Sequence, residues 1–280
     1  MNDLLDARAC GIAAAVSGQA QRRMRGWAAK YPGLYDKPEF DPALYGTLAQ
    51  AAAFAGPWYG ADQLDAANKT CLWAFGLDWL VDYQAKSEDE VTALIARVKA
   101  VAAAEAEPDD ELTAFLAELR EDLPQDPALR ALWRDELGVM LDGMALEWRW
   151  KSEGPRPDLD GYLANADNLG FSFVFFAHWI ANGAAGDLPA LRDASRVVQR
   201  VIRLLNDLGT YERDLKWGDL NALLLPGTGK DAVEARIEEL MADARRLLAP
   251  LPPEHGGYMR RQMEFCSGFY GITDYWGAEL

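Results

Sequence analysis

Apolar residues recur at intervals of three and four along most of this chain, the spacing that places them on one face of an α-helix. Alternating runs of β-branched residues, which are typical of strands, are absent from the sequence. The pattern predicts helices over about 5–25, 41–54, 62–86, 88–104, 109–121, 128–151, 158–183, 188–216, 230–248 and 255–276. Clusters of proline and glycine separate them, and no linker divides the chain. We therefore predict an all-α protein with one domain over residues 1–280.

Composition and charge narrow the range of partners. Half of the residues are hydrophobic and 11% are aromatic, which is enough to fill a large core. The net charge of −16 argues against nucleic acid as a main partner, because a phosphate backbone requires a basic surface. The N-terminus carries acids where a signal peptide needs basic residues, and the apolar runs are too short to cross a bilayer. We expect a cytoplasmic protein without membrane insertion.

Cysteine and histidine are too sparse for several kinds of site. The three cysteines are far apart, which indicates neither a zinc site nor a disulfide framework. With only two histidines, a metal site built on histidine or a Ser-His-Asp triad is not indicated. His178 lies inside an apolar run and is expected in the core.

Three oxygen-bearing side chains stand four residues apart in one predicted helix. Asn206, Thr210 and Asp214 span only about 80° of the helix surface at this spacing. Amide, hydroxyl and carboxylate oxygens are the ligands that a hard cation such as Mg²⁺ prefers. Arg203 and Arg213 share this polar face and could hold a phosphate beside the metal.

A second pair of acids, Asp78 and Asp82, has the same spacing far upstream. On a helix these acids share a face with Cys71 and Phe75, so this face changes from apolar to acidic along its length. Two carboxylates in an apolar segment indicate a specific role, because burying a carboxylate without a partner has a high free-energy cost. Two such clusters facing one cavity would hold a metal-bound anion. The alternative is that Asp78 and Asp82 face solvent near the end of a helix.

Both clusters match motifs of a known family. Residues 206–214 read N-D-L-G-T-Y-E-R-D and fit the pattern N-D-x-x-S/T-x-x-x-E/D, with a basic residue before the last acid. Residues 218–222 read G-D-L-N-A and look like its G-D-x-x-N continuation, with Asn221 one position earlier than in that pattern. Residues 78–82 fit an aspartate-rich DDxxD-type motif in which Trp79 replaces the middle acid. In order, separation and helical character, the whole chain resembles the class I terpene synthases.

The resemblance implies a helical bundle around a deep central pocket and a metal-dependent reaction. Three Mg²⁺ ions, with Mn²⁺ as an alternative, would hold the diphosphate of a prenyl substrate. Ionisation would give a carbocation that cyclises or eliminates a proton, with release of diphosphate. The resemblance is also compatible with a homodimer.

The resemblance also assigns roles to individual residues. One ion would be ligated by Asn206, Thr210 and Asp214. The other ions would be ligated by Asp78, with support from Asp82. These five residues would form the catalytic centre, and further residues would complete the pocket: Arg213, Arg203 and Lys216 would bind diphosphate, and Phe75, Trp79, Phe173 and Trp179 would line the hydrocarbon cavity.

The chain departs from the family at two cationic positions. Ala166 stands where an E-Y-x-x-x-R segment would place a diphosphate-sensing arginine, and Asp274-Tyr275 stands near the C-terminus where an Arg-Tyr pair is common. Either Arg203, Arg213, Lys216 or the pair Arg260–Arg261 compensates, or this protein handles diphosphate in an unusual way.

The atypical aspartate motif resembles that of bacterial diterpene synthases, and this resemblance implies a C20 substrate, either acyclic or a bicyclic labdane-type diphosphate. The alternatives are a C15 sesquiterpene synthase and a non-catalytic all-α binding protein of the same fold. Prenyl chain elongation or head-to-head coupling is disfavoured, because those enzymes normally carry two aspartate-rich motifs.

Overall fold

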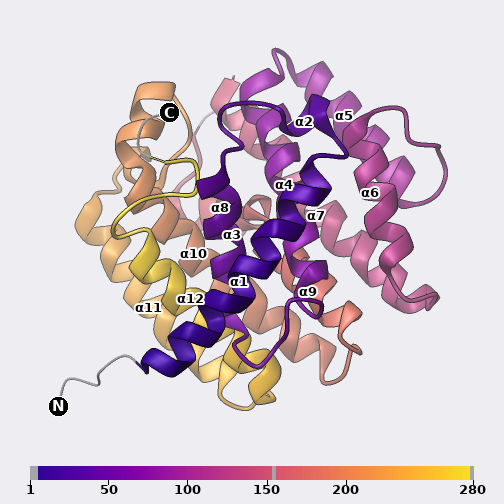
Figure 1. The fold of residues 1–280 in the computed structure, drawn as a ribbon. Helices are drawn as coiled ribbons and strands as arrows, with labels where there is room; N and C mark the ends of the chain where they lie inside the picture. The colour runs from indigo at the N-terminus through magenta and orange to yellow at the C-terminus, as the bar shows by residue number, and fades with distance from the viewer. Residues whose placement is uncertain (1–5, 153–155, 278–280) are drawn as a thin grey trace.

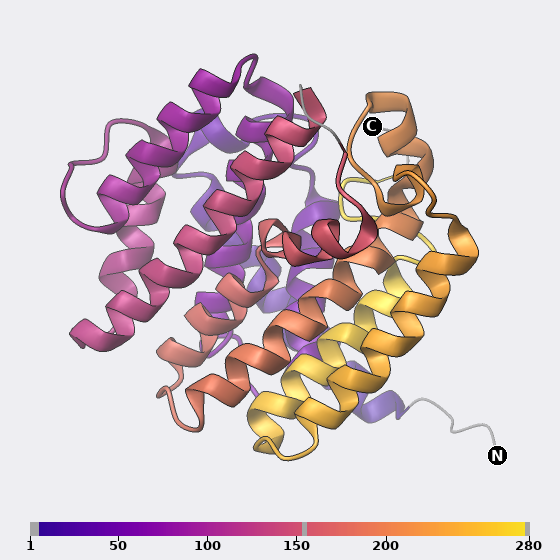
Figure 2. The same cartoon turned by 180° about the vertical axis from the view of Figure 1, so that it is seen from behind.

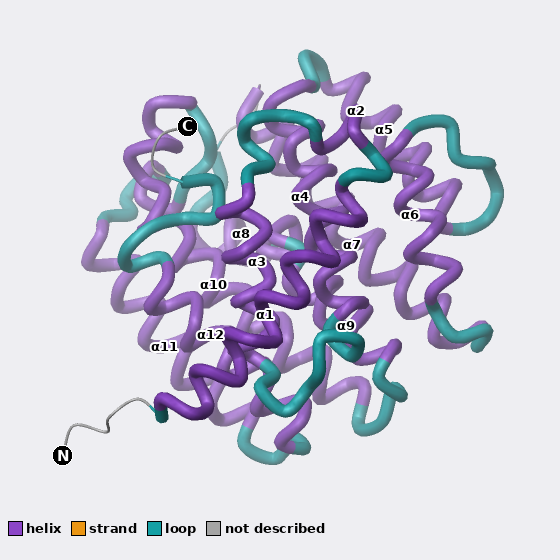
Figure 3. Tube along the Cα trace, in the orientation of Figure 1, coloured by secondary structure: helices purple, strands orange, loops and turns teal. Residues whose placement is uncertain are grey.

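The computed structural model describes residues 6–152 and 156–277, and within these ranges the regular structure is helical, without strands (Figure 3). The predicted all-α class is therefore confirmed. The α-helices are α1 (Ala7–Ala28), α2 (Pro32–Tyr35), α3 (Pro42–Ala55), α4 (Asp65–Trp79), α5 (Glu88–Ala102), α6 (Glu111–Asp122), α7 (Pro127–Ser152), α8 (Leu159–Ala164), α9 (Phe171–Ala181), α10 (Leu188–Trp217), α11 (Lys230–Leu248) and α12 (Tyr258–Phe269). Two π-helical turns (Leu80–Gln84, Pro253–Gly257) and two 3₁₀ turns (Ala166–Leu169, Ala222–Leu224) join them.

Aspartate side chains fix where many of the helices begin. Asp6, Asp41, Asp110, Asp158 and Asp187 each precede a helix and accept hydrogen bonds from its first free backbone N–H groups. This capping satisfies donors that have no partner within the helix. The sequence alone therefore determines several helix starts.

The helices pack around one contiguous core of buried side chains. α1 lies across α3, and α3 packs against both α4 and α12 (Figure 1). From behind, α7 runs beside α9, and α10 lies against α11 (Figure 2). α4 packs against α9, and α10 packs against α12. Among the described residues, no helix combines the length and apolar character that crossing a bilayer requires.

The helix predicted over 158–183 is broken in the structure. It divides into α8, the 3₁₀ turn Ala166–Leu169 and α9, with Gly170 between the last two. Gly170 has φ of 77°, and a Cβ atom there would lie 2.8 Å from Sδ of Met140. Only glycine adopts this left-handed conformation at little cost, so α9 starts in a new direction.

Two other predicted helices also end differently. The helix predicted over 62–86 begins at Asp65 and changes at Leu80 into a π-helical turn. The helix predicted over 255–276 ends at Phe269, and the segment 271–277 leaves it without forming another helix. The predicted start at residue 5 and the break at 154–155 lie outside the described residues, and the short α2 was not predicted.

Candidate active site

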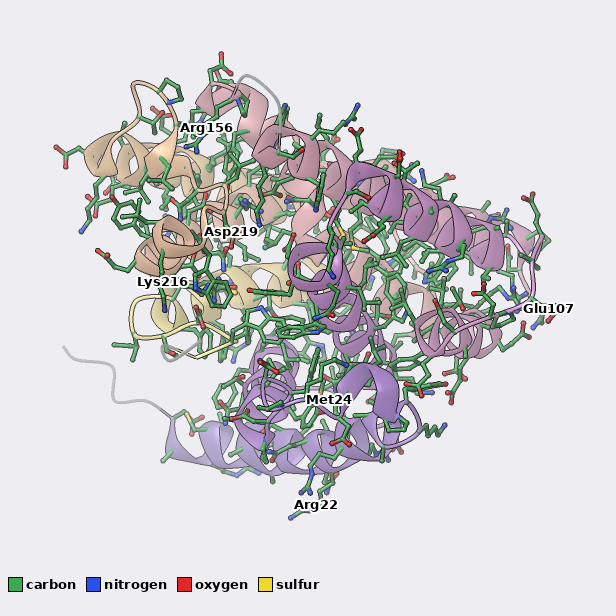
Figure 4. All side chains as sticks on the ribbon, turned by 90° about the horizontal axis from the view of Figure 1, so that it is seen from above. Arg22, Met24, Glu107, Arg156, Lys216 and Asp219 are labelled. Carbon is green, nitrogen blue, oxygen red and sulfur yellow. The ribbon has the colours of Figure 1, made fainter. Side chains whose placement is uncertain are left out.

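A cavity of about 250 Å³ lies between α3, α4, α7, α9, α10, α12 and the segment that follows α12. Its lining combines apolar side chains with six carboxylates and three cations. The charged residues are Asp78, Asp82, Glu147, Asp214, Asp219, Asp274, Lys151, Arg203 and Arg213. Figure 4 shows the side chains that fill the space between the helices, with Asp219 labelled.

The cavity has an apolar end and a charged end, which α4 connects. Asn68, Cys71, Phe75 and Asp78 all line it and stand three or four residues apart, so they form one stripe along the helix. At 1.5 Å per residue, Asp78 lies about 15 Å along the helix axis from Asn68. This is the change from apolar to acidic that the sequence predicts for this face.

Asp78 and Asp82 lie together at the charged end. The two carboxyl groups are close enough for each to affect the pKa of the other, although Asp82 belongs to the π-helical turn rather than to α4. Burial raises the pKa of Asp78 to about 6. Burial, together with the charges of Asp78 and Glu147, raises the pKa of Asp82 well above its ordinary value. Carboxylates crowded in this way favour a bound cation.

The predicted triad on α10 reaches the same cavity. Asn206 and Asp214 line it, whereas Thr210 lies behind them with 1% of its surface exposed. The Thr210 hydroxyl donates a 2.6 Å hydrogen bond to Oδ2 of Asp214, and Asn221 donates another of 2.9 Å to the same oxygen. These contacts orient the Asp214 carboxylate.

Gly209 allows the end of α12 to approach this motif closely. A Cβ atom at Gly209 would lie 2.8 Å from the backbone oxygen of Tyr270. Tyr270 lines the cavity together with Asn206 of the motif. The small residue in the motif therefore has a packing role.

The donor set fits a hard divalent cation. Two helical segments present carboxylate and amide oxygens to one cavity, with the Thr210 hydroxyl directly behind Asp214, and oxygen ligands of these kinds are those that Mg²⁺ prefers. Within the described parts of the chain, no group of three or more His, Cys, Asp or Glu side chains is close enough to hold a metal by itself. Oxygens from substrate and water would therefore have to complete each coordination shell.

The three cationic side chains of the cavity differ in how many hydrogen-bond and ion-pair partners they already have. Arg203 donates to Glu147 (2.7 Å), to the Tyr162 hydroxyl (2.6 Å) and to the backbone oxygen of Leu220 (3.4 Å). Arg213 is paired with Asp274, and its Nε is buried without a hydrogen-bond partner among the described residues. Among the described residues, Lys151 is paired with Asp219.

The structure places the other predicted cations away from the cavity. Lys216, labelled in Figure 4, is exposed because it lies two residues beyond Asp214 and so on the opposite side of α10. Arg260 pairs with Glu264 at 3.1 Å, and Nε of Arg261 donates to the backbone oxygen of Phe54 at 2.8 Å. None of the three lines the cavity in the described structure.

Of the four aromatic residues predicted to line the pocket, only Phe75 does so. Trp79 stacks on Tyr83 with ring centroids 4.6 Å apart. Phe173 packs in the core against Trp73 and Trp133. Trp179 donates a 2.9 Å hydrogen bond to the backbone oxygen of Ala185. The prediction is wrong for these three side chains. The orientation of α9 directs Phe173 and Trp179 into the core, and Trp79 lies on a side of α4 that is also buried there.

Other residues, which sequence reasoning did not select, complete the cavity. At the charged end these are Glu147, Lys151, Asp219, Asp274 and Tyr83. The additional aromatic residues are Trp148, Phe171, Phe175, Tyr258, Tyr270, Tyr275 and Trp276. Asp219 could have been found, since it belongs to the G-D-x-x-N segment. The aromatic residues of the C-terminal segment gave no signal, because that segment was predicted to be helical.

Comparisons with known proteins agree with this geometry. Residues 69–225 match the family described as terpene synthase family 2, C-terminal metal binding. The chain is 28% identical over 277 residues to ent-pimara-9(11),15-diene synthase of Streptomyces sp. strain KO-3988, with 91% of each chain covered.

Solved structures show the same fold. Linalool/nerolidol synthase from Streptomyces clavuligerus superposes with a TM-score of 0.70 at 18% identity, over 92% of this chain and 95% of that one. The 2-methylisoborneol synthase from Streptomyces coelicolor A3(2), in complex with Mg²⁺ and 2-fluoroneryl diphosphate, gives a TM-score of 0.72 at 15% identity, over 94% and 91%. The chain belongs to the class I terpene synthases, enzymes that act on prenyl diphosphates.

Proposed function

We propose that this enzyme ionises a C20 prenyl diphosphate, acyclic or bicyclic and labdane-type, and releases a diterpene. The observation that carries the reaction class is the pairing of two oxygen-rich motifs across one cavity whose other end is apolar. The C20 assignment rests on the relative that matches over 91% of both chains, since a pimaradiene is a C20 product.

The metal centre is proposed to use both motifs. Asn206, Thr210 and Asp214 would hold one Mg²⁺, and Asp78 with Asp82 would hold two more. When bound, the ions neutralise the diphosphate and stabilise the charge that develops as it departs. The excess of carboxylates over cations in the lining supports this assignment, because diphosphate by itself would be repelled.

Two side chains are proposed to replace the absent sensor arginine. Lys151 and Arg213 line the charged end, and each is paired with an acid that also lines the cavity. Each cation could exchange this acid for a diphosphate oxygen. Arg203 is proposed as a positioning residue, because its donors already hold Glu147 and Tyr162.

The hydrocarbon would occupy the apolar end. Phe75, Phe175 and Trp276 present aromatic surface to the cavity and would exclude water from the reacting carbons. Aromatic faces also attract a carbocation through their negative quadrupole. A folded substrate would therefore cyclise or lose a proton before bulk water reaches it.

The proposal is tested by incubating the protein with Mg²⁺ and C10, C15, C20 or bicyclic C20 diphosphates, followed by mass spectrometry of the extracts. We expect a terpene from a C20 substrate. Products from the C15 substrate alone would overturn the C20 assignment and leave the reaction class intact. Absence of diphosphate release from all four would favour a non-catalytic binding protein.

A further inference from the structure

Asn68 is a polar residue that the proposed chemistry leaves without a role. It lines the cavity near its apolar end and is 1% exposed. Its Nδ2 has no hydrogen-bond partner among the described residues. Leaving a buried donor unsatisfied is destabilising, whereas a leucine at this position would leave no polar group without a partner. An amide here therefore points to a ligand that it binds.

A second amide faces the same end of the cavity from α12. Cys71 on α4 and Cys266 on α12 both line the cavity, and Cys266 is close enough to contribute to the raised pKa of the Cys71 thiol. Asn68 lies one helical turn before Cys71, and Gln262 lies one turn before Cys266. Both helices run toward the charged end, so the two amides lie at a similar depth.

The side-chain amide of Gln262 also has few hydrogen-bond partners among the described residues. Its side chain lines the cavity, and its one described hydrogen bond is a long contact of 3.6 Å from Nε2 to the sulfur of Cys266. A buried water molecule needs two to four polar partners, and two amide groups supply both donors and acceptors.

We propose that Asn68 and Gln262 together hold one water molecule at the apolar end of the cavity, and that this water captures the final carbocation to give a terpene alcohol. This rests on the proposed function. The position of this water explains why it reacts only with the final carbocation, because Asn68 lies about 15 Å along α4 from Asp78. Water held there is remote from the carbon that first loses diphosphate and meets only the far end of a long substrate.

The step balances without an oxidant or reductant. Diphosphate leaves with the electron pair of the broken carbon–oxygen bond. After rearrangement, a lone pair of the bound water forms a new carbon–oxygen bond to the cationic carbon. The resulting oxonium loses one proton to solvent water as the product leaves, and the released diphosphate takes up one proton from solvent. One substrate and one water thus give one alcohol and one protonated diphosphate.

The experiment is turnover in H₂¹⁸O with the prenyl diphosphate that the substrate panel identifies. We expect an alcohol whose mass rises by two units. Asn68→Leu and Gln262→Leu should each lower the fraction of alcohol among the products by about tenfold in favour of hydrocarbons, with diphosphate release retained. Cys71→Val reshapes the wall one turn away but keeps both amides, so it should still give mainly the alcohol.

The outcomes separate the two proposals. Diphosphate release with only hydrocarbon products from the unaltered enzyme would overturn the water site and leave the terpene synthase assignment standing. An unchanged alcohol fraction in both leucine variants would also overturn it. Absence of diphosphate release from every substrate would count against the proposed function itself. If one leucine variant fails to fold, the other still tests the site.

Discussion

The Tyr162 hydroxyl donates a 2.9 Å hydrogen bond to Oδ1 of Asp207, across 45 residues of sequence. Asp207 is 1% exposed, and its Oδ2 accepts the backbone N–H of Ala222 at 3.3 Å. Burial raises the pKa of Asp207 to about 7, against the opposing effects of Arg203 and Tyr162. Two neighbouring residues of one motif therefore have different roles. Asn206 faces the cavity, whereas Asp207 connects α10 by hydrogen bonds to α8 and to the segment after α10.

Tyr162→Phe should lower the free energy of unfolding by about 1–3 kcal/mol, because it removes a donor from a buried acid. Denaturant unfolding at neutral pH measures this. Tyr211→Phe, on the partly exposed side of α10, should change stability by less than about 0.5 kcal/mol. Equal effects of the two substitutions would contradict an anchoring role for Tyr162.

Asp78→Asn should reduce diphosphate release from a prenyl substrate by at least about 100-fold, since it removes a proposed metal ligand. The helical circular dichroism spectrum should be unchanged. Asp142→Asn is the matched control, because Asp142 is exposed and pairs with Lys99 at 2.5 Å outside the cavity. Near-normal turnover by the Asp78 variant would remove this residue from the proposed metal centre.

Lys151→Gln should weaken inhibition by inorganic diphosphate by about tenfold, because one charged contact is lost from a partly exposed site. Lys99→Gln, which removes a similar surface ion pair on α5, should leave inhibition unchanged. The inhibition constant of each variant in the presence of Mg²⁺ is the measurement. The same constant for Lys151→Gln and the unaltered enzyme would show that Lys151 does not bind diphosphate.

Mg²⁺ and inorganic diphosphate together should raise the melting temperature by several degrees, because ligands that bind only the folded state stabilise it by about 2.7 kcal/mol at 100 times Kd. Each alone should have a smaller effect, since neither completes the site. Thermal melts with EDTA as the control measure this. Stabilisation by diphosphate that persists in EDTA would argue against metal-mediated binding.

His178 should make folding stability depend on pH between about 4 and 6.5. Burial, with a smaller effect of His255, lowers its pKa to about 4 in the folded protein. Between these values the unfolded chain binds a proton that the folded protein does not, so stability falls as pH falls. The full contribution, about 3 kcal/mol, is present above pH 6.5 and is lost towards pH 4.

His178→Phe removes this titration while keeping a ring that can stack on Tyr258, as His178 does at 4.9 Å between ring centroids. Urea unfolding at several pH values should show that the variant loses less stability on acidification than the unaltered protein. Parallel pH profiles for the two proteins would mean that His178 is not buried in its neutral form.

Local sequence determined much of this molecule. The four-residue spacing of Asn206, Thr210 and Asp214 placed them on one side of α10, because backbone hydrogen bonds within a helix impose 3.6 residues per turn whatever surrounds it. The same rule placed Phe75 and Asp78 on one side of α4. Aspartate caps and proline marked helix starts such as that of α10 at Leu188.

Only the tertiary structure decided which of these faces meet. Arg213 pairs with Asp274 across 61 residues, and Lys151 with Asp219 across 68. The resemblance to terpene synthases placed Phe173 in the pocket, but the packing of α9 turned it into the core. Such contacts depend on how helices from all parts of the chain bury their apolar surfaces together, and that is a property of the whole fold rather than of any single segment.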